Sequence, residues 1–206
     1  VAFCLEEAGI KAADLSCVAH YDNPVLTFSR LLQTYLEYPF QSYGSFKRAI
    51  PLWIKQKLKM PKVIEESIPG FQGDIFFSRH HESHAASAFF CSPFEEAAIV
   101  IADGVGEWAT ASIGEGHGNT IRLIKELRFP HSIGLFYSAM TQYLGFEVNS
   151  DEYKVMGLAP YGEPKYLDKL LGRVLDLKED GSIALNLDYF NYTHGVTMIN
   201  DRLTAH

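Results

Sequence analysis

Two histidines one helical turn apart, and an aspartate at the end of an apolar strand pattern, are the residues of this chain best suited to chemistry. His80 and His84 lie in the segment RHHESHAA, and on a helix their imidazoles would share one face with Cβ atoms about 5–6 Å apart. Two rings at this spacing can grip one metal ion, as HExxH zinc helices do. Asp103 follows in AIVIADGVGEW. Two histidines and one carboxylate, with positions left open, suit Fe(II) or another divalent ion that must also hold a substrate.

Local sequence leaves two alternatives open for these histidines. Paired histidines on a helix also arise by chance or as surface pairs that bind nothing. His81 and His84 are three residues apart and share a helical face as well, so His81 could be the ligand in place of His80.

Glycines beside the aspartate indicate either close backbone approach or a turn. Gly104 and Gly106 lack Cβ atoms, so the backbone could adopt positive φ there and its N–H groups could cradle a phosphate. A tight hairpin turn beginning with Asp-Gly explains the same residues. Further along, Ser132 could cap a helix whose N-terminus faces an anion, and His131 is either a donor there or a plain flanking residue.

Composition bounds the class of protein. The chain has 206 residues, is 47% hydrophobic and carries a net charge of −7, so it has ample core material and no basic surface typical of nucleic-acid binding. The basic stretch 46–62 is interpreted as a solvated helix face, with a membrane or nucleic-acid surface as the alternative. No apolar run is long enough to span a membrane, and no signal peptide opens the chain.

Nucleophilic and redox chemistry find little support in the sequence. No GxSxG elbow is present, and the cysteines have no CxxC spacing. An odd number of cysteines without this spacing predicts reduced thiols in the cytoplasm, and their apolar surroundings predict burial. The three are Cys4, Cys17 and Cys91.

The periodicity of apolar residues predicts an alternating α/β chain. Helices are expected over residues 1–8, 26–36, 45–59, 81–90, 131–144, within 149–162, and over 164–175. Strands are expected over residues 15–20, 74–78, 97–102, 108–113, 121–129 and 182–187, with a glycine-rich hairpin turn over 114–118 and with 97–102 buried on both faces. A histidine helix followed by three antiparallel strands, with helices around them, predicts a ribonuclease-H-like or actin-like mixed sheet.

The chain resembles the nodulation-type O-carbamoyltransferases, which include antibiotic-tailoring enzymes. The segments that carry the resemblance are HHESHAASAFFCSPF, DGVGEWATASIGEG, FPHSIGLFYSAMTQYLGF, NSDEYKVMGLAPYG and LNLDYFNY, which fall in this order between residues 80 and 192. Motifs of this length in this order are far more specific than the histidine pair alone.

The resemblance implies an actin-like (ASKHA) N-terminal domain, of which residues 1–206 are a part, and a C-terminal YrdC-like domain that lies outside this chain. It implies that carbamoyl phosphate and ATP give carbamoyl-adenylate, and that the carbamoyl group then passes to a hydroxyl of a small-molecule acceptor with the help of a divalent metal. By position, His80, His84 and Asp103 match metal ligands of the family. Gly104, Gly106 and the segment around Gly134 match regions that line the nucleotide.

The resemblance also sets expectations about parts and rivals. The fold is expected to be incomplete at both ends. The 206 residues are expected to fold, as a homodimer if exposed surface needs covering. They are not expected to catalyse the reaction on their own. The general base is open, with Asp188 and His131 as weak candidates. The rival functions are a tRNA threonylcarbamoyl-transferase relative and a non-catalytic metal- or nucleotide-binding module.

Overall fold

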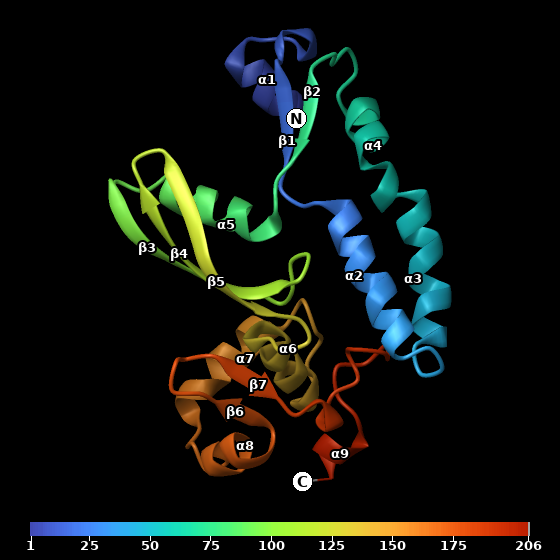
Figure 1. Ribbon diagram of the computed structural model, residues 1–206, viewed down its shortest axis with the longest axis vertical. Coiled ribbons are helices and arrows are strands. Elements are labelled where there is room, and N and C mark those ends of the chain that lie inside the picture. Colours follow the sequence, from blue (N-terminus) through green and yellow to red (C-terminus); the bar gives the residue numbers. More distant parts are fainter. Residues whose placement is uncertain (206) are drawn as a thin grey trace.

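Helices and three small sheets alternate along residues 1–205, the part of the chain that the computed structural model describes (Figure 1). The strands are β1 (Cys17–His20), β2 (Asp74–Phe77), β3 (Glu96–Ala102), β4 (Ala109–His117), β5 (Thr120–Arg128), β6 (Leu175–Leu177) and β7 (Ile183–Leu185). The α-helices are α1 (Ala2–Ala8), α2 (Pro24–Glu37), α3 (Tyr43–Lys55), α4 (Met60–Ser67), α5 (His80–Phe89), α6 (Ile133–Tyr143), α7 (Glu152–Leu158), α8 (Leu167–Arg173) and α9 (Asp201–Thr204). The predicted mixed α/β class is confirmed at this level, but the described strands form three separate sheets rather than the one mixed sheet that was expected.

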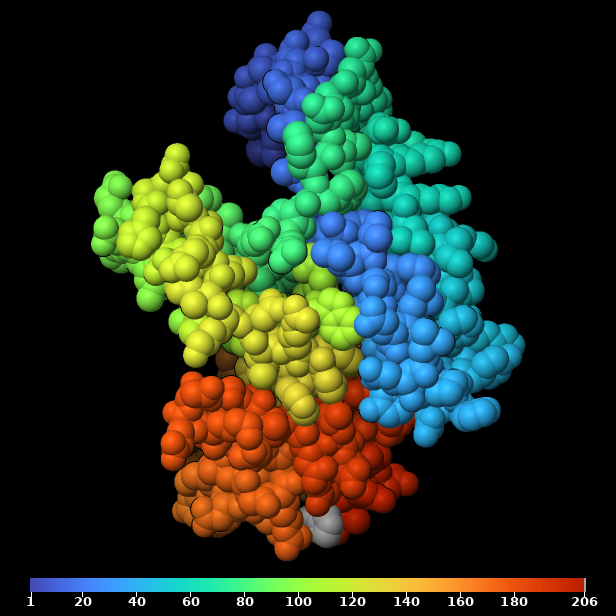
Figure 2. Space-filling view, viewed as in Figure 1, coloured from blue at the N-terminus to red at the C-terminus, as the bar shows by residue number. Residues whose placement is uncertain are grey.

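The parallel pair β1–β2 leads the chain to the histidine helix. Its register runs from Cys17 opposite Asp74 to His20 opposite Phe77. Parallel strands need a crossover connection, and here α2, α3 and α4 provide it along one side of the molecule (Figures 1 and 2). Because only two residues separate β2 from α5, the first turn of that helix is held at the end of the pair.

The helix α5 packs on one face of the antiparallel sheet β3–β4–β5. Ala85 and Phe89 of the helix form a buried cluster with Ile99 and Ile101 of β3. Gly116 of β4 makes this approach possible, because a Cβ atom there would lie 2.7 Å from the Phe89 ring. The helix is therefore fixed against the sheet whose β3 strand leads into Asp103.

Two predictions about this sheet are wrong in detail. Gly114 and Gly116 belong to β4 rather than to a turn, and only Gly118, at φ 55°, serves the hairpin. Gly114 sits at a register shift against β5, where its missing side chain leaves room for the neighbouring backbone. The strand β3 is not buried on both faces: Val100 is 77% exposed, because α5 covers only the opposite face.

A second core joins the C-terminal elements to α6. Phe190 and Ala139 are completely buried at its centre. The other buried members are Val174, Leu175, Leu185 and Leu203. The helix expected over 164–175 is shorter than predicted, because Leu175 leaves it to start β6 in this core, where it pairs with Leu185 of β7.

Two further expectations about the chain are corrected. The helix expected over 45–59 ends earlier, at Lys55, and Pro61 lies in the first turn of α4, where proline is well tolerated. The three cysteines are free, as predicted, but all are exposed rather than buried. Cys4 lies on α1, which has no buried residue, while Cys17 lies on β1 and Cys91 follows α5.

Candidate metal centre

The two predicted histidine ligands and the predicted aspartate converge at the start of α5. The His80 Nε2 atom lies 3.0 Å from Asp103 Oδ2 and 3.1 Å from His84 Nε2. The His84 Nε2 atom lies 3.8 Å from the same carboxylate oxygen. One ligand atom from each residue fits within a group no wider than 4.8 Å.

These separations fit donors that share one ion. With metal–ligand distances near 2.1 Å, two donors 3.0–3.8 Å apart subtend about 90–130° at the metal, the range of tetrahedral and octahedral sites. The Asp103 Oδ2 atom is buried, and apart from the three imidazoles within 4.0 Å it has no hydrogen-bond partner within residues 1–205. A buried carboxylate oxygen of this kind needs a positive partner, and a cation beside the two imidazoles would provide one. The residues present therefore fit a divalent ion.

His81 lies beside this group, and the Nδ1 side of its ring is turned to β4. Its ring is buried, with Nδ1 only 2.7 Å from the Ser112 hydroxyl of β4, and its Nε2 is 4.0 Å from Asp103 Oδ2. Burial lowers the pKa of His81, partly offset by the Asp103 charge. The geometry thus favours His80 over His81 as the partner of His84, a choice that spacing alone left open.

The loop after β3 packs closely against both α5 and α6, and a glycine at each contact makes this possible. A Cβ atom on Gly106 would lie 3.0 Å from the His80 Cβ atom, and one on Gly134 would lie 2.4 Å from the Asp103 carbonyl oxygen. Neither Gly104 nor Gly106 has the positive φ that their residue type permits. Their N–H groups are engaged within the loop, Gly104 with Asp103 Oδ1 at 2.6 Å and Gly106 with the Ala109 carbonyl at 2.9 Å.

Sequence reasoning missed two residues that support the centre. Ser112 holds His81, and Glu107 accepts backbone N–H groups from His80 and Asn23. The local sequence offered one signal, since Glu107 lies on the same loop as Asp103. Contacts over 31 and 27 positions along the chain have no local pattern to reveal them.

The two candidate bases lie apart from this cluster and have other partners. The His131 Nδ1 atom accepts the Leu185 N–H at 3.1 Å, so the ring joins the segment before α6 to β7. Asp188 is exposed and pairs with Arg202 at 2.9 Å. The structure groups neither of them with His80, His84 and Asp103.

His131 should make folding stability depend on pH. Burial lowers its pKa below the ordinary value of 6.5, and its Nδ1 must be unprotonated to accept the Leu185 N–H. The unfolded chain then binds the proton more readily, so the contribution is complete above about pH 6.5 and is lost as the pH falls through this value towards the folded pKa. His131→Asn keeps an acceptor and removes the titration. Its unfolding free energy, measured by urea melts between about pH 7 and 5, should fall less steeply than that of the parent, by at most about 1.4 kcal/mol per pH unit.

The exposed His117 provides the control for this experiment. It pairs with Glu96 at the surface, so His117→Asn makes the same exchange away from any buried backbone contact, and His131→Asn should change the slope more. A His131→Asn protein with the parent slope would contradict the assignment.

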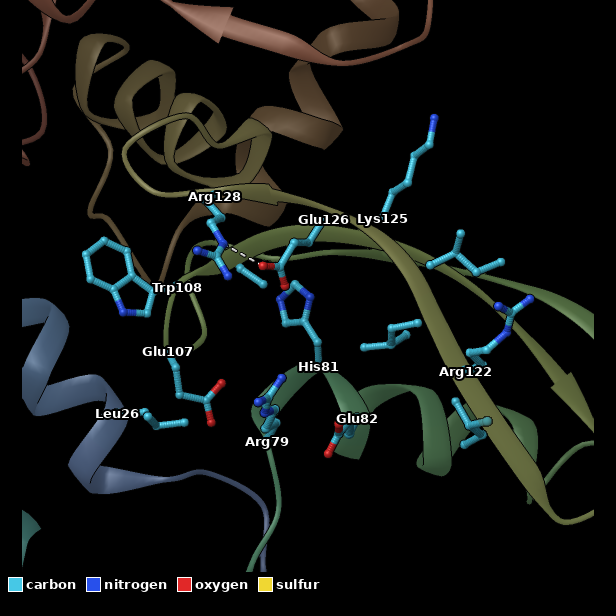
Figure 3. A pocket seen from close by; sticks show the side chains of 14 residues that line it. Leu26, Arg79, His81, Glu82, Glu107, Trp108, Arg122, Lys125, Glu126 and Arg128 are labelled. Carbon is cyan, nitrogen blue, oxygen red and sulfur yellow. Dashed lines mark hydrogen bonds and ion pairs between the residues drawn. The ribbon is translucent and has the colours of Figure 1, made fainter.

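A cavity of about 670 Å³ lies between α5 and β5, next to the group of His80, His84 and Asp103. Figure 3 shows His81 pointing from the helix towards the strand, with Glu107 reaching in from the loop. Charged side chains of both signs line the remainder, including Arg128, which pairs with Glu126. The cavity shares His81 and Glu107 with the surroundings of the cluster.

Comparison with known proteins gives the family. The sequence profile of the family Carbamoyltransferase N-terminus matches residues 1–205, and the chain belongs to this family. The chain is 50% identical to an uncharacterized protein of Synechocystis, over 97% of this chain and 34% of that protein. It is 34% identical to the nodulation protein NolNO of Sinorhizobium fredii, over 91% of this chain and 26% of the relative. It is 39% identical to the nodulation protein NolO of Bradyrhizobium diazoefficiens, over 53% of this chain and 20% of the relative.

These comparisons confirm the resemblance to nodulation-type carbamoyltransferases, but they cover only part of each relative. The chain spans about a third or less of the length of these relatives.

Along the described residues, every helix is too short or too polar to cross a membrane.

Proposed function

We propose that the chain is the acyl-transfer part of an O-carbamoyltransferase, which moves a carbamoyl group from carbamoyl-adenylate to a hydroxyl of a small-molecule acceptor. Carbamoyl phosphate and ATP would supply the carbamoyl-adenylate. The observation that carries the proposal is the convergence of His80, His84 and Asp103 in a chain of this family. The actin-like arrangement of the domain and a cytoplasmic location belong to the same proposal, and the free cysteines support the location.

The chemistry of the transfer is consistent with these residues. The acceptor oxygen forms a bond to the carbamoyl carbon, the bond from that carbon to the phosphate oxygen breaks, and AMP leaves with the electron pair. The hydroxyl proton must pass to a base. A divalent ion, Fe(II) or similar, would supply Lewis-acid polarisation of the mixed anhydride. His80 and His84 would hold it from one helical face, and Asp103 would hold it from the loop while offsetting its charge.

The nucleotide is proposed to lie beside the loop 103–107 and the start of α6. Ser132 caps α6 by accepting the Leu135 N–H at 3.0 Å, and the Ser132 hydroxyl lies 2.7 Å from the Gly104 carbonyl oxygen. These contacts tie the helix start to the loop, and Gly134 allows the close packing that the tie requires. A helix N-terminus close to the loop favours negative charge there, as on the departing AMP.

The test is product analysis with the full-length protein. Carbamoyl phosphate, ATP and a panel of hydroxylated metabolites are supplied, and mass spectrometry looks for an acceptor that has gained one carbamoyl group together with release of AMP. Carbamoylated product that depends on both substrates and on the acceptor supports the proposal. Nucleotide turnover that never yields such a product, over a broad panel, would count against it.

A further inference from the structure

Glu107 is a nearly buried carboxylate at the metal centre that the proposed reaction leaves without a role. Only 7% of the residue is exposed. Its Oε1 atom accepts the His80 N–H at 3.0 Å and the Asn23 N–H at 3.1 Å, and its Oε2 atom accepts the His80 N–H at 3.1 Å. The carboxylate thus joins three segments, the loop after β3, the first residue of α5 and the residue that precedes α2.

The start of α5 needs a partner of this kind. The N-terminal N–H groups of a helix have no acceptor within the helix, and Arg79 at the N-cap makes no side-chain capping bond. Glu107 supplies the acceptor from elsewhere in the chain. A negative charge at a helix N-terminus is stabilised by the helix dipole, and charge-assisted hydrogen bonds are the stronger kind.

The same loop contacts the first turn of α5 at three successive points. Asp103 reaches the imidazole of His80, Gly106 packs against the side chain of His80, and Glu107 holds the backbone N–H of His80. The contact between Asp103 and His80 joins two proposed ligands. The contacts of Gly106 and Glu107 therefore set the distance between the Asp103 carboxylate and the His80 imidazole. Metal-ligand geometry here depends on how firmly the loop is docked.

We propose that Glu107 is a positioning residue, which docks the loop carrying Asp103 onto the helix carrying His80 and His84 and thereby sets the affinity of the centre for a divalent ion. This inference rests on the proposed function only in taking these three residues as ligands. Glu107 acts through the His80 backbone and is not itself one of the three ligands.

The experiment measures Co²⁺ binding to the full chain, by titration calorimetry and by the visible d–d spectrum of the bound ion. Glu107→Gln keeps the shape and one acceptor oxygen, and should weaken Co²⁺ binding about 10-fold; Glu107→Ala removes both oxygens and should weaken it up to about 100-fold. Both variants should also alter the intensity of the d–d bands, because the coordination geometry is no longer held. A purely structural role would lower stability without moving that spectrum.

Glu126→Gln is the matched control, since Glu126 also lines the cavity but pairs with Arg128. It should bind Co²⁺ as the parent does. A Glu107→Gln protein with the affinity and spectrum of the parent would overturn the inference. So would a variant that binds Co²⁺ more weakly with an unchanged spectrum and whose metal-free form is less stable to the same degree. If Glu107→Gln changes nothing while loss of both histidines abolishes binding, only this inference fails. If loss of both histidines also changes nothing, the ligand assignment of the proposed function fails.

Discussion

Replacing His80 and His84 together by alanine is expected to lower the affinity of the protein for a divalent ion by more than about 100-fold, beyond the loss that outer-shell changes cause. Two of the three donor atoms grouped within 4.8 Å would be gone, and Asp103 would remain with a buried oxygen that makes no hydrogen bond. Metal content after purification and a Co²⁺ titration both measure the effect. In the full-length enzyme, transfer of the carbamoyl group to an acceptor should fall in parallel.

The control must show that removing a histidine elsewhere on the surface does not lower metal affinity. His117 is exposed and pairs with Glu96 across the ends of β3 and β4, so His117→Ala should leave metal affinity unchanged. A double variant that keeps its bound metal would place the ion elsewhere. A parent protein that purifies without metal and binds none would favour the non-catalytic alternative.

The grouping of His80, His84 and Asp103 could be predicted from the sequence because each part of it rests on a local rule. The i, i+4 spacing of His80 and His84 needs only a helix, and the apolar run before Asp103 needs only a strand. Their convergence depends on α5 packing against β3, which the buried contacts of Ala85 and Phe89 secure. Spacing could not decide whether His80 or His81 is the partner of His84. The geometry favours His80 because the hydroxyl of Ser112, on β4, lies against the His81 ring.

Element types were predicted more reliably than burial. The glycine-rich segment of β4 looked like a turn because glycine there serves packing, under Phe89 and at a register shift, rather than reversal of the chain. The outer face of β3 and the three cysteines were expected inside because their neighbours in sequence are apolar, whereas burial depends on whether another element covers them. Glu107 carried no periodic signal, since its partners are backbone N–H groups of two distant segments.

Gly134→Ala is expected to destabilise the fold by about 1–3 kcal/mol, the cost of inserting a methyl group into a site with no room for it. The new Cβ atom would lie 2.4 Å from the Asp103 carbonyl oxygen and 2.7 Å from the Gly104 nitrogen. Both are backbone atoms, which cannot swing aside as a side chain would. Either α6 retreats from the loop or the loop moves, and in the second case Asp103 moves with it. We therefore expect Co²⁺ binding to weaken as well, about 10-fold, as for other changes to the supporting shell.

Gly157→Ala gives a control of opposite sign. Gly157 also lies in a helix, α7, but a Cβ atom there would meet nothing within 4 Å. Alanine is the better helix former by about 1 kcal/mol, so this variant should be as stable as the parent or more stable. Urea unfolding of the two variants side by side separates helix propensity from close packing. Equal stability of both would mean that α6 and the Asp103 loop yield to each other easily, and that the close approach at Gly134 does not fix the position of the loop.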